Sequence, residues 1–148
     1  MVKLPPPIWA SIYVLATLAI SWLLGWPAMP GFPLPAFGAA LTFLPWVLPV
    51  WAAVRFRREG TEISPISPAN RALIIDGPYR FTRNPMYLGL VLVTLGIAIW
   101  IGTWPMFLAP VAVFLTANSV HIPFEEAKMR RQFDGAYDEY LGQVRRWV

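Results

Sequence analysis

The fold is decided by residues 86–123, which read MYLGLVLVTLGIAIWIGTWPMFLAPVAVFLTANSVHIP. This stretch holds no Asp, Glu, Lys or Arg, and none occurs between Lys3 and Arg55 either. A transmembrane helix needs about 20 apolar residues to cross about 30 Å of hydrocarbon. Two uncharged stretches of this length therefore predict an integral membrane protein and exclude an ordinary soluble globule.

Each uncharged stretch divides into two spans at a break that no helix crosses easily. The first break is the proline-rich segment 26–35, and the second is Gly102-Thr103-Trp104-Pro105. The predicted fold is all-α, with four transmembrane helices in one domain (1–148) and a C-terminal amphipathic helix on the cytoplasmic side. The four spans are expected at about 8–26, 36–54, 86–104 and 106–123.

The composition narrows the possible chemistry. Of the 148 residues, 57% are hydrophobic and 14% are charged, whereas soluble domains carry about 25% charged residues. With no Cys and one His, the chain offers no disulfide, thiolate nucleophile, sulfur-based zinc site or histidine cluster, so no metal site is expected.

The charges also predict the topology, because they gather in the loop 55–85, in the tail 124–148 and at Lys3. By the positive-inside rule these segments are cytoplasmic, which places both termini inside a multi-pass protein of a prokaryotic inner membrane. Topology accounts for the net charge of +4, so the expected partners are membrane lipids and not nucleic acid.

The first candidate site segment is 76–89, where Gly77 starts a turn and Pro85 starts a helix with Asn84 as its N-cap. Free N–H groups at a helix N-terminus bind anions, and Tyr79 and Tyr87 could stack on a planar ring. The alternative is that the tyrosines only anchor the chain at the membrane interface.

The second candidate segment begins at His121, where the last span leaves the bilayer. Glu125 lies four residues later, on the same face of a helix, and Glu126 follows it. Adjacent carboxylates at an apolar boundary are costly unless they are paired or used, so His121 and Glu125 could orient a cationic or hydroxyl-bearing ligand. Alternatively, the two carboxylates only begin an interfacial helix.

The tail that follows has apolar residues at mostly helical spacing between charged ones, which is typical of an amphipathic helix at the headgroups. Gly135 and Gly142 are expected to weaken this helix locally. Its apolar positions are Phe124, Met129, Phe133, Tyr137, Tyr140 and Val144.

Taken in order, residues 71–148 resemble the isoprenylcysteine carboxyl methyltransferase family, which is related to the phospholipid N-methyltransferases. The matching elements are Gly77-Pro78-Tyr79, Arg83-Asn84-Pro85-Met86-Tyr87-Leu88-Gly89, Glu125-Glu126, Phe133-Asp134, Tyr137, Tyr140 and Val144-Arg145-Arg146-Trp147. Each piece is weak alone, whereas the ordered set with its apolar hairpin is specific.

The resemblance implies an integral membrane methyltransferase that binds S-adenosyl-L-methionine (SAM) between the loop and the tail and methylates a lipophilic small-molecule or lipid acceptor. The residues that it places against the cofactor are Arg71, Ala72, Leu73, Ile74, Tyr79, Asn84, Pro85, Met86, Tyr87 and Glu125. His121 and Glu125 are the candidates for orienting the acceptor.

Three positions depart from the family pattern. Asn84 replaces a histidine, Asp134 replaces a glycine, and His121 stands where eukaryotic members place an arginine that holds the acceptor carboxylate. A carboxylate acceptor would lose its bidentate partner at His121, which disfavours prenylcysteine as the acceptor.

Two acceptor chemistries stay open, namely isoprenylcysteine-like carboxyl methylation and phospholipid amine methylation. The alternative from a different functional class is that the protein is a non-catalytic membrane adaptor or a small transporter. The spans contain no charged residue for an ion or proton pathway, which argues against a transporter.

Overall fold

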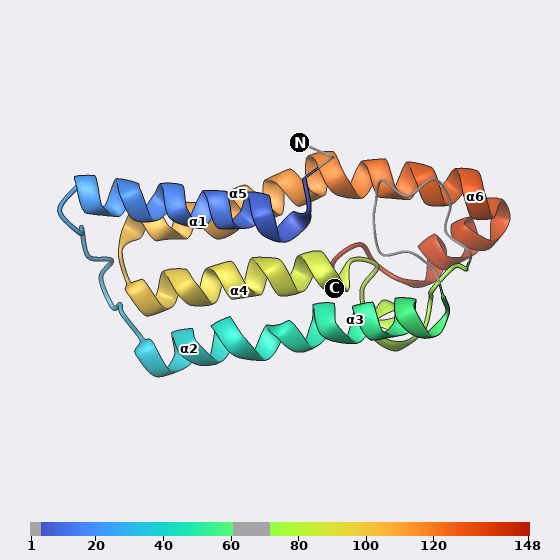
Figure 1. Ribbon diagram of the computed structural model, residues 1–148, viewed down its shortest axis with the longest axis horizontal. Helices are drawn as coiled ribbons and strands as arrows, with labels where there is room; N and C mark the ends of the chain where they lie inside the picture. The colour runs from blue at the N-terminus through green and yellow to red at the C-terminus, as the bar shows by residue number, and fades with distance from the viewer. Residues whose placement is uncertain (1–3, 61–71) are drawn as a thin grey trace.

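The computed structural model describes residues 4–60 and 72–148, in which every regular element is a helix. Helix α1 (Pro6–Leu23) is followed by a rod that joins α2 (Pro35–Phe43), η1 (Leu44–Trp46) and α3 (Val47–Arg58). Figure 1 shows this rod and α1 on either side of α4 (Pro85–Ile101), which is central to the bundle.

A second rod returns along the bundle after α4. It consists of η3 (Trp104–Phe107), α5 (Leu108–Thr116), the π-helical turn η4 (Ala117–His121) and α6 (Ile122–Gln143). The short helix η2 (Gly77–Arg80) precedes α4, on the side of the bundle where α3 ends.

Prolines and glycines set the helix boundaries, as the sequence predicts. Pro35 and Pro85 lie in the first turns of α2 and α4, where a missing N–H costs nothing. Pro45 lies in the 3₁₀ turn η1, which interrupts the first rod where a proline kink is expected. Gly102 ends α4 in the left-handed conformation with φ 73°, a backbone that glycine adopts without strain.

Three helices are long and apolar enough to cross a membrane, namely Pro6–Leu23, Pro35–Arg58 and Trp104–Gln143. The all-helical fold is therefore confirmed for the described residues, with three candidate membrane spans. Helix α4 is also apolar but has 17 residues, so it is shorter than the other three. The predicted fourth span, the orientation and the amphipathic character of the tail stay predictions.

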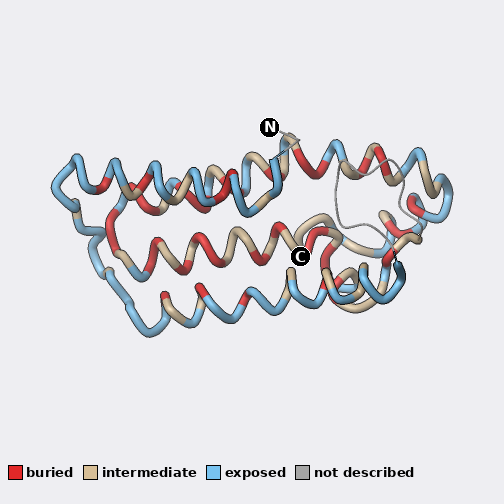
Figure 2. Tube along the Cα trace, viewed as in Figure 1, coloured by how far each residue is buried: buried red, intermediate tan, exposed pale blue. Residues whose placement is uncertain are grey.

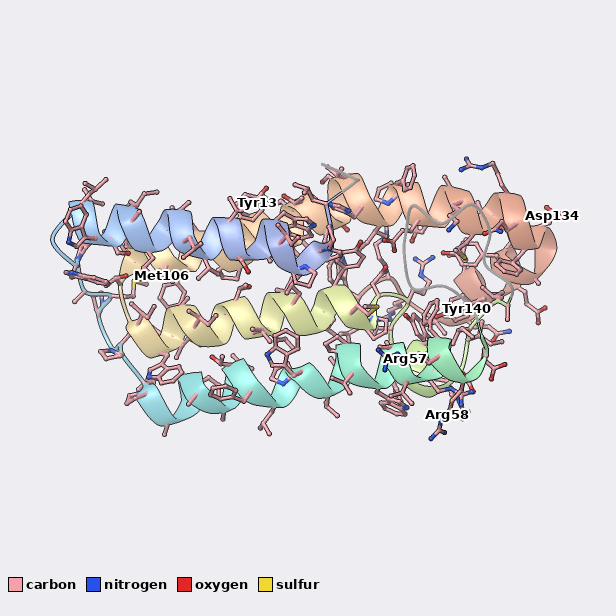
Figure 3. All side chains as sticks on the ribbon, viewed as in Figure 1. Tyr13, Arg57, Arg58, Met106, Asp134 and Tyr140 are labelled. Atoms are coloured by element: carbon pink, nitrogen blue, oxygen red, sulfur yellow. The ribbon has the colours of Figure 1, made fainter. Side chains whose placement is uncertain are left out.

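The last span continues without interruption into the first part of the tail, up to Asp134, and is not separated from it at residue 123. The π-helical turn η4 precedes Pro123, whose ring would otherwise clash with the carbonyl one turn earlier. The rod breaks at Asp134, where φ is 40°, one residue before the predicted weak point Gly135. Helix α6 then continues through Gly142 to Gln143, and the chain turns back toward α3 at the tip labelled Asp134 (Figure 3).

Glycines let α4 approach the first rod closely. A Cβ atom added at Gly96 would lie 2.4 Å from the backbone nitrogen of Thr42, and one at Gly38 would lie 2.6 Å from that of Trp100. Small residues at such contacts are typical of helices that associate in lipid. Figure 2 shows buried residues recurring along α4, whereas much of the outer surface of α1 and of the first rod is exposed.

Candidate functional site

The candidate site forms at the end of the bundle where α4 begins. Tyr87, in the first turn of α4, donates a hydrogen bond from its hydroxyl to Oε1 of Glu125 over 2.6 Å. Glu125 lies in the first turn of α6. The two segments that the sequence singles out separately are therefore in direct contact.

His121 lies beside this contact in a buried aromatic setting. Its side chain is 1% exposed, and its ring stacks on that of Trp9 with centroids 5.0 Å apart and planes inclined by 18°. The centroid of the Tyr87 ring is 6.0 Å from that of His121. A single helical face thus directs His121 and Glu125 toward the same tyrosine.

Three polar atoms of this cluster have no hydrogen-bond partner in the described part of the chain, namely both ring nitrogens of His121 and Nε1 of Trp9. A buried polar group without a partner costs about 1–3 kcal/mol, so such atoms often mark a place where a ligand or water binds. Trp9 comes from α1, and no pattern in the sequence relates it to His121.

The start of α4 differs from its predicted form in one respect. Asn84 occupies the N-cap position as predicted, but its side chain makes no capping hydrogen bond, and its Nδ2 donates to the carbonyl oxygen of Arg146 over 2.9 Å. Pro85 has no N–H, and the N–H of Leu88 bonds to the carbonyl of Asn84. The N–H groups of Met86 and Tyr87 therefore have no acceptor within the helix.

Tyr79 lies across from α4 on η2. Its carbonyl oxygen accepts a hydrogen bond from the Tyr140 hydroxyl over 2.7 Å, and its ring contacts Phe56 with centroids 5.8 Å apart. Burial, and after it the Glu125 carboxylate, raises the pKa of the Tyr79 phenol, which stays neutral at physiological pH. Figure 3 places Tyr140 between α6 and the end of α3.

The segment before η2 that contains the predicted cofactor contacts 71–74 is described from Ala72 onward. Ile74 is buried, Ala72 and Leu73 are half-buried, and Arg71 lies outside the described residues. No contact recorded for these residues brings them to Glu125, so their predicted role against a cofactor stays a prediction.

The two adjacent carboxylates have different surroundings. Glu126 is 7% exposed and is paired with two guanidinium groups, Arg83 at 3.4 Å and Arg146 at 2.6 Å. Buried charges require such pairing. Glu125 is half-buried and accepts the bond from Tyr87. The resemblance assigns the cofactor contact to Glu125 of the two, and in the structure it is Glu125 that contacts Tyr87.

Glu125 lies beyond the uncharged stretch 84–124, on the polar part of the rod. Burial raises the pKa of its carboxyl to about 7, although the bond from Tyr87 and the charge of Lys128 oppose the rise. The carboxyl is thus poised to become fully ionised when a cation binds beside it.

This set of groups fits a zwitterion that carries a cationic centre and a planar ring. The free N–H groups at the start of α4 suit a carboxylate, Glu125 suits a cation, and Tyr79 and Tyr87 offer aromatic surface. The unpartnered atoms of His121 and Trp9 lie next to the same tyrosine, on the side of α1.

Comparison with known protein families identifies one match. The sequence profile described as "Phospholipid methyltransferase" matches residues 34–136, which is more than half of the chain. The matched range contains Tyr79, Asn84–Tyr87, His121 and Glu125, whereas Trp9 and residues 144–148 lie outside it. No curated protein matches the chain.

Proposed function

This chain belongs to the phospholipid methyltransferase family, and from that premise we propose that it transfers a methyl group from SAM to a lipophilic acceptor at the cytoplasmic face of the membrane. The proposal includes four spans with both termini inside. The observation that carries it is the Tyr87–Glu125 hydrogen bond, which joins the two segments that hold the candidate cofactor and acceptor residues.

The cofactor supplies an electrophilic methyl group on a sulfonium cation, and the protein has to hold and desolvate it. In our proposal the Glu125 carboxylate faces the cationic part, and the N–H groups of Met86 and Tyr87 bind the carboxylate end. The remaining predicted contacts are Arg71, Ala72, Leu73, Ile74, Tyr79, Asn84 and Pro85. Neither a nucleophilic side chain nor a metal is needed for this chemistry.

The acceptor site is proposed at His121 and Trp9. Their unpartnered nitrogens provide one acceptor and two donors in a buried setting between α1 and α4, because a neutral imidazole has one nitrogen of each kind. An uncharged His121 can hold the proton that an amine or hydroxyl acceptor must lose. A lipophilic acceptor reaches this position from the bilayer.

One observation favours an amine over a carboxylate as the acceptor. Among the described residues, Arg83 and Arg146 lie at the site, and both are paired with Glu126. A carboxylate acceptor would compete with Glu126 for these guanidinium groups, whereas an amine needs none. Phospholipid amine methylation is our preferred form of the reaction, and isoprenylcysteine-like carboxyl methylation is the second candidate.

Binding of SAM tests the proposal directly. We expect calorimetry on the full-length protein in lipid nanodiscs to give a dissociation constant of about 10 μM, in the range common for enzyme ligands. In Glu125→Ala the affinity is expected to fall at least about thirtyfold, because a buried charge-assisted contact contributes about 2 kcal/mol.

The matched control is Glu139→Ala, which removes the same side chain from an exposed position on α6. It is expected to bind SAM like the wild type. A folded wild-type protein that binds no SAM would contradict the proposal and favour a non-catalytic adaptor.

The affinity for SAM is expected to fall in acid, because only the ionised Glu125 attracts a cation. With a pKa of about 7 in the free protein, the carboxyl is largely protonated at pH 6 and ionised at pH 8, so binding weakens about tenfold between pH 8 and pH 6. Calorimetry at both values checks this. In Glu125→Gln, the change in SAM affinity between pH 8 and pH 6 should shrink to the part that comes from titration of SAM itself. If the affinity of this variant still falls about tenfold, a group other than Glu125 is responsible for the pH dependence.

A further inference from the structure

The last five residues, which we call the C-terminal strap (144–148), run back from α6 to the start of α4 (Figure 1). Their backbone bonds to the segment just before α4. The carbonyl of Arg145 accepts from the N–H of Arg83 over 3.0 Å, and the carbonyl of Arg146 accepts from Nδ2 of Asn84 over 2.9 Å. Thr82 also donates from its hydroxyl to Arg146, over 3.2 Å.

The side chains of the strap bond to the second rod. The Arg146 guanidinium donates to both oxygens of Glu126, over 2.6 and 3.2 Å. Nε1 of Trp147 donates to Oδ1 of Asn118 in the π-helical turn over 3.1 Å, and its ring lies against Phe114 with centroids 4.8 Å apart. The strap thus connects three parts of the site that are far apart in the sequence.

This connection matters because α6 extends past the bundle. Among the described residues, its one extensive helix contact is with η4, which continues directly into it. The core packing of Ile122 beside Tyr87 fixes where α6 begins. Beyond that point, polar contacts set how α6 lies against Tyr87 and Asn84, and they include the strap's bonds to Glu126, the Arg83–Glu126 pair and the bond from Tyr140 to Tyr79.

We infer that the strap is a positioning device of the candidate site, in which Arg146 holds Asn84 and the Glu125 turn of α6 in register for the cofactor. The inference rests on the proposed function for the identity of the ligand. In this inference, Glu126 is the counter-ion of the strap residue Arg146. Arg146 and Trp147 are positioning residues that touch neither the cofactor nor the acceptor.

Positioning of this kind is reciprocal. If a docked strap raises the affinity for the cofactor, the bound cofactor must stabilise the docked strap by the same factor. The backbone amide of Arg83 reports on docking, because its acceptor is the strap carbonyl of Arg145. SAM is therefore expected to slow hydrogen exchange at this amide.

The test compares Arg146→Gln with Arg145→Gln in full-length protein in nanodiscs. Both changes remove one positive charge, but the exposed Arg145 side chain makes no hydrogen bond or ion pair in the described part of the chain. For Arg146→Gln we expect SAM to bind about tenfold more weakly and the Arg83 amide to exchange about tenfold faster, whereas Arg145→Gln stays within about twofold of wild type.

Two readouts separate positioning from general destabilisation. Arg146→Lys keeps the charge and is expected to recover most of the SAM affinity, and Arg146→Gln should raise KM for the methyl donor while KM for the acceptor is unchanged. Equal effects on both KM values, with no recovery in Arg146→Lys, would overturn the inference. Where Arg146→Gln fails to fold, Trp147→Phe is used instead, because it removes only the donor to Asn118.

The outcomes also separate this inference from the proposed function. A wild-type protein that binds no SAM refutes the function, and the exchange rate of the Arg83 amide in the two variants still tests the strap. A wild-type protein that binds SAM, with an Arg146→Gln variant that binds it equally well, refutes the strap alone.

Discussion

Replacing His121 by phenylalanine is expected to lower methyl transfer about a hundredfold, the lower end of what a positioned proton acceptor contributes. Phenylalanine keeps a flat ring that can stack on Trp9, so the packing between α1 and η4 is largely retained. The change removes both unpartnered nitrogens, which are the groups proposed to hold the acceptor and its proton.

The measurement is transfer of a labelled methyl group from SAM into organic-extractable product, with phosphatidylethanolamine vesicles as the acceptor. SAM affinity is measured in parallel and is expected to stay within about twofold of wild type, because His121 is not among the proposed cofactor contacts. A His121→Phe variant with full turnover would remove His121 from the acceptor site. Loss of SAM affinity would instead assign His121 to the cofactor.

A Gly96→Ala change is expected to destabilise the bundle by about 2–3 kcal/mol, the usual range for overpacking a close contact. The added Cβ would lie 2.4 Å from the nitrogen of Thr42 and 2.5 Å from the carbonyl carbon of Leu41. Both are backbone atoms of α2, so no change of rotamer relieves the clash and the two helices must move apart.

The matched control is Gly142→Ala in α6, where an added Cβ meets nothing within 4 Å. There the same substitution is expected to stabilise the helix by up to about 1 kcal/mol through its better propensity. Thermal unfolding of both variants in the same detergent checks that Gly96→Ala lowers the stability and Gly142→Ala raises it. A Gly96→Ala protein as stable as wild type would mean that α2 and α4 do not pack through this glycine.

Local signals predicted where α4 begins and ends, whereas the spans predicted at 36–54 and 106–123 continue as helix to Arg58 and into the tail. Pro85 and Gly102 bound α4 because each has a conformational preference that holds regardless of the rest of the chain. Asn84 is the N-cap residue as predicted, but the partner of its side chain was not predicted. Its Nδ2 donates to the carbonyl of Arg146, 62 positions away, and no local signal points to that tertiary bond.

The composition of the candidate site was predicted in part. Tyr87 and Glu125 were expected on separate evidence from two segments, and in the structure a hydrogen bond joins them. Trp9 was missed, because an aromatic residue in an apolar span carries no signal that relates it to a histidine over a hundred positions later. The pairing of Glu126 with Arg83 and Arg146 was missed as well, since neighbours on a helix point in directions that only the packing distinguishes.

The sequence by itself determined that this is a helical membrane protein and that its polar chemistry lies at the ends of apolar spans, because the cost of placing charge in hydrocarbon is a property of each residue alone. The tertiary structure decided what neutralises Glu126, what surrounds His121 and where the C-terminal strap docks. These features depend on distances between segments that are remote in the chain. Which charged groups are buried, and which groups pair with them, follows only from how those segments pack together.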